Sequence, residues 1–116
     1  MPTQPHEFLP LTPAVFHILL SLADADRHGY AIMQEVEERT MGAVRLGPGT
    51  LYGAIRRLRA DGLIEELEGD GSAGDERRRY YHLTGLGRKV ARLEAERLEE
   101  MVVAARARLA RAPRPA

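Results

Sequence analysis

The spacing of the apolar residues predicts three helices in the first half of the chain. In the first, which starts after Thr12, apolar residues recur at intervals of three and four: Val15, Ile18, Leu19 and Leu22. This period buries one face of a helix, and Thr12 and Pro13 are typical of an N-cap and a first helical position. A second helix is expected over residues 30–41, with Tyr30 packed between helices and Gly42 just past its end.

The third helix has an apolar stripe on one side and arginines on the other. Its apolar residues lie at i, i+4 and i+7: Leu51, Ile55 and Leu58. At about 100° per residue, Gly53, Arg56 and Arg57 fall opposite that stripe and face solvent. Thr50 is expected as the N-cap or in the first turn, and Gly62 as the left-handed C-terminal stop.

The second half of the chain predicts a β-hairpin and then one long helix. Residues 63–68 and 77–83 alternate in polarity around a glycine-rich tip, which is typical of an antiparallel hairpin, with Tyr81 in the core and Tyr80 facing away. Thr84 is a good N-cap for a helix of about 25 residues, roughly 38 Å long. This order predicts a mostly α fold with a small β-hairpin, a winged helix-turn-helix followed by one long C-terminal helix. We expect an irregular arm over 1–10, the winged domain over 11–83, a dimerisation helix over 84–110 and a disordered tail over 111–116.

A sharp change in charge separates the third helix from the hairpin. Residues 44–60 contain no acid, whereas residues 61–76 contain seven acids and no base, although the chain as a whole is neutral. Arginines on a helix face are usually only solvated. On the third helix of a helix-turn-helix they favour contact with a DNA groove, because arginine can bind a guanine edge or a phosphate. The predicted DNA contacts are Thr50, Tyr52, Gly53, Arg56, Arg57, Arg77, Arg78 and Arg79, with one wing arginine pairing internally with Glu65, Glu66 or Glu68.

The last helix carries two apolar stripes. The early one is Leu86, Val90 and Leu93, and a later one, rotated by roughly 110°, is Leu98, Met101, Val102, Ala105 and Leu109. Leaving the later stripe in water would cost about 25 cal/mol per Å². We therefore predict that it forms a homodimer interface together with Phe8, the alternative being a helix that folds back on its own domain. A two-fold dimer would present two recognition helices to a palindromic operator in double-stranded DNA.

The composition argues against several classes of function, among them metal-binding proteins, enzymes and membrane proteins. The chain has no cysteine, and its four histidines lack ligand spacing, so neither a metal nor another cofactor is expected. No nucleophile–base pair or phosphate-binding glycine loop is present, which argues against an enzyme. No apolar run approaches the roughly 18 residues of a membrane span, and no leader is visible, so we expect a cytoplasmic protein without a membrane partner. The remaining alternative to DNA binding is a winged-helix module that docks another protein.

Three segments resemble the PadR family of bacterial transcriptional regulators: "LTPAVFHILLSLADADRHGYAIMQEV", "GPGTLYGAIRRLRADGLIE" and "RRRYYHLTGLGRKV". The specific marks are "HGY", "GTLY" and "YYHLT", and the single last helix resembles the shorter branch of the family. The resemblance implies a winged-helix dimer that usually represses transcription and responds to a small-molecule effector or stress. It also places Thr50, Tyr52 and Arg56 where family members contact DNA. Two departures stand out: many members have proline where Gly53 stands, and the last helix lacks the aromatic residues that stack drugs in some members.

Overall fold

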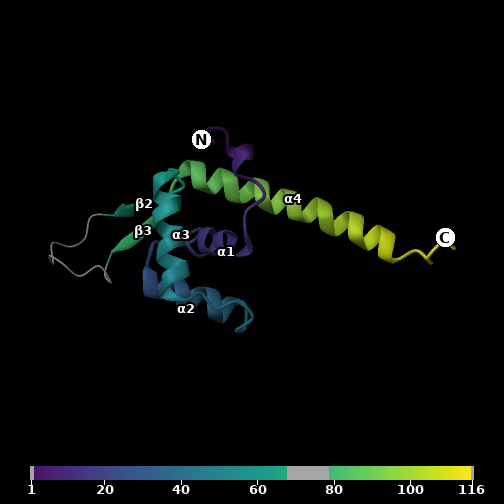
Figure 1. Cartoon of the computed structure of the whole chain (residues 1–116), viewed down its shortest axis with the longest axis horizontal. Helices are drawn as coiled ribbons and strands as arrows, with labels where there is room; N and C mark the ends of the chain where they lie inside the picture. Colours follow the sequence, from purple (N-terminus) through teal and green to yellow (C-terminus); the bar gives the residue numbers. More distant parts are fainter. Residues whose placement is uncertain (1, 68–78, 116) are drawn as a thin grey trace.

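The structure is a computed structural model and describes residues 2–67 and 79–115 (Figure 1). Its elements, in chain order, are the 3-10 helix η1 (Pro5–Phe8), α1 (Pro13–Ser21), β1 (Arg27–His28), α2 (Gly29–Arg39), α3 (Pro48–Ala60), β2 (Ile64–Leu67), β3 (Tyr80–Leu83) and α4 (Gly85–Leu109). The predicted winged-helix order with a long last helix is confirmed.

The sheet has three strands, where the sequence predicted a two-stranded hairpin. The strand order is β1-β3-β2, and both pairings are antiparallel. Ile64 lies opposite Leu83 in the predicted hairpin, and Arg27 lies opposite Tyr81 in the additional pairing. Strand β1 was missed because two residues directly before a helix are too few for an alternating pattern.

Local capping explains where three of the helices begin. The Thr12 side chain accepts a hydrogen bond from the Val15 amide at the start of α1, and Thr84 accepts one from Gly87 at the start of α4. Both N-caps were predicted. At α2 the cap is His28, whose Nδ1 accepts from the Ala31 amide at 3.1 Å.

Helix α3 begins two residues earlier than Thr50. Gly47 is its N-cap and provides no side-chain hydrogen bond. Thr50 therefore lies in the first turn, which was one of the two positions expected for it. At the other end, Gly62 adopts the predicted left-handed conformation with φ of +77°.

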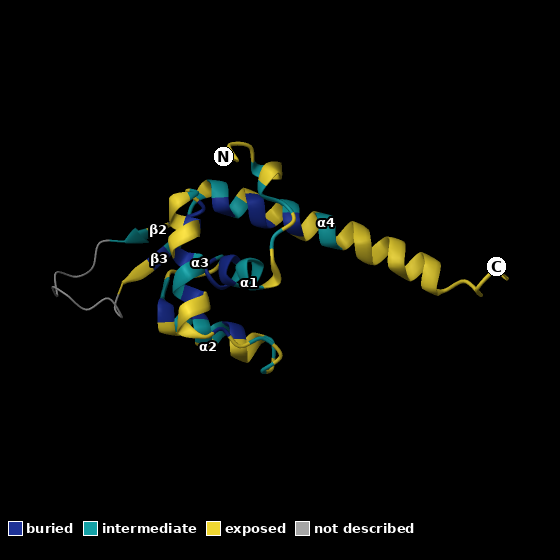
Figure 2. Ribbon diagram, viewed as in Figure 1, coloured by how far each residue is buried: buried dark blue, intermediate teal, exposed yellow. Residues whose placement is uncertain are grey.

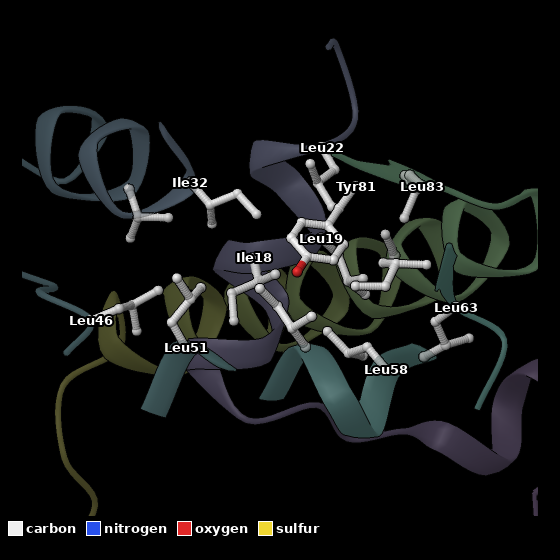
Figure 3. Close-up of a cluster of buried hydrophobic side chains, with 14 of the residues drawn as sticks. Ile18, Leu19, Leu22, Ile32, Leu46, Leu51, Leu58, Leu63, Tyr81 and Leu83 are labelled. Atoms are coloured by element: carbon white, nitrogen blue, oxygen red, sulfur yellow. The ribbon is translucent and has the colours of Figure 1, made fainter. Parts of the chain in front are cut away.

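The core lies between α1, α2, α3, the sheet and the first half of α4 (Figure 3). Its fully buried side chains come from every one of these elements and include Ile18, Ile32, Leu51, Ile64 and Val90. Tyr81 is 4 % exposed, as predicted, and Tyr80 faces solvent.

Tyr30 was expected between helices, and this prediction is wrong: its side chain is 56 % exposed. The buried face of α2 consists of Gly29, Ile32 and Val36. Gly29 and Ile32 each stand one residue before Tyr30 and Met33, the pair that the sequence suggested for this face.

The N-terminal arm is more ordered than predicted. Its 3-10 helix η1 packs along α4, and Phe8 and Leu9 are half-buried against the core. Glu94 of α4 is 1 % exposed and accepts a hydrogen bond from the Leu11 amide at 2.8 Å. The carboxylate also pairs with Arg97. A buried charge therefore fastens the end of the arm to the long helix.

Helix α4 is covered only along its first half (Figure 2). Its buried residues are Gly87, Val90, Ala91 and Glu94, whereas every residue from 99 to 110 is exposed. The helix does not fold back, and the molecule extends over 66 × 33 × 23 Å. Leu98 follows Glu94 by four residues and Ala91 by seven, so the later apolar stripe continues the buried face. The early stripe named from the sequence was not the centre of the buried face, because Leu86 and Leu93 lie at its edge, and this is why the two stripes differ by roughly 110° on the helical wheel.

Candidate nucleic-acid interface

Helix α3 presents its arginines outward. Leu51, Ile55 and Leu58 are at most 3 % exposed, and Arg56 and Arg57 on the other side are exposed. Among residues 2–67 and 79–115, no acidic group lies within 4.0 Å of either guanidinium. Both guanidinium groups therefore face outward from the described part of the chain.

The N-terminal end of α3 is also open. Gly47, Pro48, Gly49 and Thr50 are all exposed, and no side chain caps the first turn. Uncapped amides at a helix start carry partial positive charge and bind phosphate oxygens. The exposed Thr50 hydroxyl adds a donor at the same end.

Tyr52 packs against the start of α2. A Cβ atom built on Gly29 would lie 2.5 Å from the Tyr52 hydroxyl oxygen and 2.9 Å from Cζ. The ring is half-buried against the core. The two sequence marks "HGY" and "GTLY" thus meet in space, and Tyr52 joins α3 to α2 in addition to its predicted role at a phosphate.

Gly53 leaves open space beside Arg56. The nearest atom to a Cβ built at Gly53 is Nη2 of Arg56, at 4.0 Å. A small residue at this outward position allows another molecule to approach the helix backbone closely.

The wing begins with a shared carboxylate. Glu66 of β2 pairs with Arg59 of α3 at 3.0 Å and with Arg79 at 3.0 Å. The predicted internal pairing of one wing arginine is confirmed, and the acid is Glu66. Arg77 and Arg78 lie outside the described residues. The part played by Arg59 was missed, although its partner lies only seven residues further along the chain.

The surface between α3 and the wing is hollowed and mixed in charge. A hollow of roughly 560 Å³ is lined by Arg56, Arg59, Ala60, Ile64, Glu65 and Glu66. Beneath it, burial raises the pKa of Tyr81 and the Glu66 carboxylate adds to this effect. The Tyr81 phenol therefore stays neutral and contributes packing rather than charge.

The predicted dimer residues divide into two groups. Met101, Val102 and Leu109 are 56 %, 45 % and 84 % exposed, Ala105 is exposed and Leu98 is half-buried. Phe8 instead packs on its own domain beside α4. Because the Phe8 side chain is only half-buried, its exposed part remains open to another molecule.

Residues 18–93 match the family model described as "Transcriptional regulator PadR-like family". The chain belongs to the PadR-like family. Among curated relatives, it is 39 % identical over 87 residues to "Transcriptional regulator Rv3488" of Mycobacterium tuberculosis (strain ATCC 25618 / H37Rv), a match that covers 73 % of this chain and 75 % of that one. It is 40 % identical over 84 residues to an uncharacterized 37.1 kDa protein in transposon TN4556 of Streptomyces fradiae. That match covers 72 % of this chain and 22 % of the relative. The chain spans 64 % of uncharacterized protein X of Lysinibacillus sphaericus.

Solved structures show the same fold. A transcriptional regulator from Clostridium thermocellum superposes with a TM-score of 0.69 at 28 % identity, covering 79 % of this chain and 88 % of that one. A PadR family regulator from Clostridium difficile R20291 gives 0.69 at 26 % identity, covering 82 % and 96 %. The description of a third, hsRosR-S4, calls it a complex structure; its TM-score is 0.61 at 27 % identity, covering 90 % and 97 %. None of the described helices is long and apolar enough to cross a bilayer.

Proposed function

We propose that this PadR-like protein is a sequence-specific DNA-binding repressor that binds an inverted repeat as a homodimer. The observation that carries the proposal is the outward face of α3. Arg56 and Arg57 are exposed there, opposite a fully buried stripe and behind an open helix start. An α-helix of this kind fits the major groove of B-DNA.

Each residue of the interface has a proposed role. Arg56 and Arg57 read base edges or grip phosphates, since a guanidinium can donate two parallel hydrogen bonds. Thr50 and the amides of the first turn bind a phosphate, and Gly53 permits close approach. Tyr52 and the wing arginines Arg77, Arg78 and Arg79 contact the backbone, with Arg79 shared with Glu66.

The dimer and the effector belong to the same proposal. The uncovered apolar residues of α4 support self-association, because water-exposed apolar area on a regular stripe is unfavourable in a lone chain. Release of DNA by a small-molecule effector rests on the family resemblance alone.

The decisive experiment selects bound duplexes from a random pool with the purified protein. The proposal expects an enriched inverted repeat with half-sites about one DNA turn apart. Arg56→Ala should weaken binding to the selected site by about 1–3 kcal/mol and relax the preference at one position. Arg92→Ala, which removes an exposed arginine from α4, serves as the matched control and should leave binding unchanged.

Two results would contradict the proposal. Equal affinity for every duplex would remove sequence specificity. Failure to bind any duplex at low salt, together with a co-purifying protein, would favour a protein-docking module instead. Arg78→Ala distinguishes a phosphate contact from a base contact. It should weaken binding to all DNA sequences alike and lower the slope of log binding constant against log salt concentration by about one.

A further inference from the structure

We infer that Arg59 is a further DNA-binding residue, which holds one backbone phosphate in the hollow between α3 and β2 and gives up its ion pair with Glu66 to do so. This inference rests on the proposed DNA-binding function and adds a residue and a means of regulation to it. The ligand is a phosphodiester of the same duplex that α3 reads.

In the free protein, Glu66 engages two arginines in the way that a phosphate would. Its Oε2 lies 3.0 Å from Nη2 of Arg59, and its Oε1 lies 3.0 Å from Nε of Arg79. Each carboxylate oxygen therefore meets a different guanidinium, one from α3 and one just before β3. A phosphodiester has two free oxygens that accept the same charge-assisted bonds. Glu66 thus stands in for a backbone phosphate.

The two arginines can be reached from solvent, whereas the carboxylate is largely covered. The side chains of Arg59 and Arg79 are 41 % and 47 % exposed, and that of Glu66 is 21 % exposed. A guanidinium on a long stem can turn from one anion to another without movement of its helix or strand. Because exposed ion pairs contribute little to stability, a phosphate can compete with Glu66 at low cost to the fold.

The hollow provides the space for the incoming group. Its volume is roughly 560 Å³, and the α3 residues Arg56, Arg59 and Ala60 line it opposite Ile64, Glu65 and Glu66 of β2. A water molecule takes up about 30 Å³, so the hollow can hold a phosphate, its sugar and several waters. Arg56 keeps its proposed role at a base edge, and its charge beside the hollow adds to the attraction for phosphate.

The hollow also lies on the path of a DNA backbone. Figure 1 shows the strands β2 and β3 beside α3. With α3 in the major groove, the sugar–phosphate backbone that borders this groove runs along the flank of the helix. Arg59 follows Arg56 by three residues and lies near the end of α3, where the chain turns into β2. One duplex can therefore contact both arginines.

Glu65 offers an internal comparison with Glu66. It is exposed, lines the same hollow and lies opposite His82 in the sheet. Among residues 2–67 and 79–115, no cationic nitrogen lies within 4.0 Å of its carboxylate. Glu65 therefore adds a negative charge to the hollow without holding an arginine of the described part of the chain.

A double-variant cycle tests the exchange. Affinities of Glu66→Gln, Arg59→Ala and the double variant for the selected duplex are measured at low salt and compared with wild type. Arg59→Ala alone should change the affinity less than about threefold, because it removes the phosphate contact and the competing ion pair together. In the Glu66→Gln protein, where the carboxylate no longer competes, Arg59→Ala should lower the affinity about tenfold.

Glu65→Gln is the matched control, since it removes the same charge from the same hollow. It should raise the affinity less than about threefold, and Arg59→Ala should have the same effect with and without it. If Glu66 acts only by repelling the duplex, the two glutamate variants will behave alike, and the effect of Arg59→Ala will not depend on residue 66. That result would overturn the exchange.

A second measurement follows the arginines and distinguishes DNA from a free anion. The Nε–H signals of Arg59 and Arg79 are recorded by NMR and assigned with the variants Arg59→Lys and Arg79→Lys. Both signals should shift with an equimolar amount of duplex, and with inorganic phosphate only at much higher concentration. A shift with inorganic phosphate and none with duplex would make the hollow a small-anion site and overturn the assignment to DNA.

The outcomes separate this inference from the proposed function. Specific duplex binding without coupling between residues 59 and 66 overturns the inference alone and leaves the proposed roles of Arg56 and Arg57 intact. Absence of binding to any duplex at low salt overturns the proposed function and the exchange with it. Thermal unfolding of each variant checks that the fold is kept. Arg59→Lys, which retains the charge but not the planar fork, should show the same coupling at a smaller size.

Discussion

The phenol of Tyr52 occupies the space that a side chain on Gly29 would need. A Cβ atom there would lie 2.5 Å from the hydroxyl oxygen and 3.0 Å from Cε1. Two elements of the helix-turn-helix are therefore held together by a ring on one helix and the absence of a side chain on the other. This contact lets α3 approach the start of α2 closely.

Gly29→Ala should destabilise the fold by about 1–3 kcal/mol, because the half-buried Tyr52 ring must move. Gly53→Ala is the matched control, since its added methyl group meets open space, and it should stabilise α3 by up to about 1 kcal/mol. Chemical denaturation of both variants measures the difference. Equal effects of the two substitutions would show that the Tyr52 contact does not constrain position 29.

Gly87→Ala should be far more damaging than Gly85→Ala two residues earlier. A Cβ atom on Gly87 would lie 2.0 Å from the Leu63 carbonyl oxygen and 2.7 Å from Cδ1 of Leu83, whereas Gly85 faces open space. Because backbone atoms occupy the space of the methyl group at position 87, Gly87→Ala should lower the free energy of unfolding by about 3 kcal/mol or more. Gly85→Ala should leave it within about 1 kcal/mol of wild type. Thermal unfolding of the two variants tests this. Similar melting temperatures for both would contradict the close approach of Gly87 to the Leu63 backbone.

The stability that Glu94 contributes by holding the Leu11 amide should depend on pH. The hydrogen bond from Arg97 lowers the pKa of Glu94; burial opposes this, and the Leu11 amide adds to the lowering. A depressed folded-state pKa gives stability that is present above the unfolded value of about 4.3 and is lost as pH falls through the folded value. The stability difference between wild type and Glu94→Gln should therefore be present at neutral pH and shrink below about pH 4.

Glu94→Ala separates the loss of the hydrogen bond from the loss of the charge. It leaves the Leu11 amide without its acceptor, so it should cost about 1–3 kcal/mol, more than Glu94→Gln, whose amide oxygen still accepts that bond. The unfolding free energy of the three proteins, measured across pH, provides the test. A difference that is the same at pH 3 and pH 7 would exclude the charge as its source.

Much of the fold follows from short-range patterns. The stripe of Leu51, Ile55 and Leu58 and the caps Thr12 and Thr84 are set by residues within one or two turns, so the sequence predicted them correctly. The prediction for Tyr30 was wrong because the buried face of α2 runs through Gly29, Ile32 and Val36, and Tyr30 lies about 100° from Gly29 around the helix. The periodicity therefore predicted that a helix forms here, but it did not predict which side of the helix is buried.

Contacts between residues far apart in the chain could not be predicted from the sequence. The bond from the Leu11 amide to Glu94 joins residues 83 positions apart, and no local pattern marks either partner. The pairing of β1 with β3 joins Arg27 to Tyr81 and is equally distant. At the candidate site, the outward arginines of α3 were predicted from one helical period, whereas the sharing of Glu66 between Arg59 and Arg79 required the wing to be placed in space.

Glu66 should restrain DNA binding. Its carboxylate occupies Arg59 and Arg79 and adds a negative charge near α3. Under the proposed function, Glu66→Gln should raise affinity for any duplex about tenfold at low salt and steepen the salt dependence, because two arginines become available to phosphates. Gel shifts over a salt series measure this, with Glu100→Gln as the charge-matched control on α4. Unchanged or weaker binding would show that the wing lies away from the duplex.

Thr84 connects three parts of the molecule within a few ångströms. Its hydroxyl donates to the Gly62 carbonyl at 2.7 Å, just past α3, and accepts from the Gly87 amide at 3.0 Å inside α4. Since Gly87 also lies against the Leu63 backbone, the first turn of the long helix is held closely to the residues that follow α3. A tilt of α4 would therefore be transmitted through Thr84 and Gly87 to the residues at the end of α3.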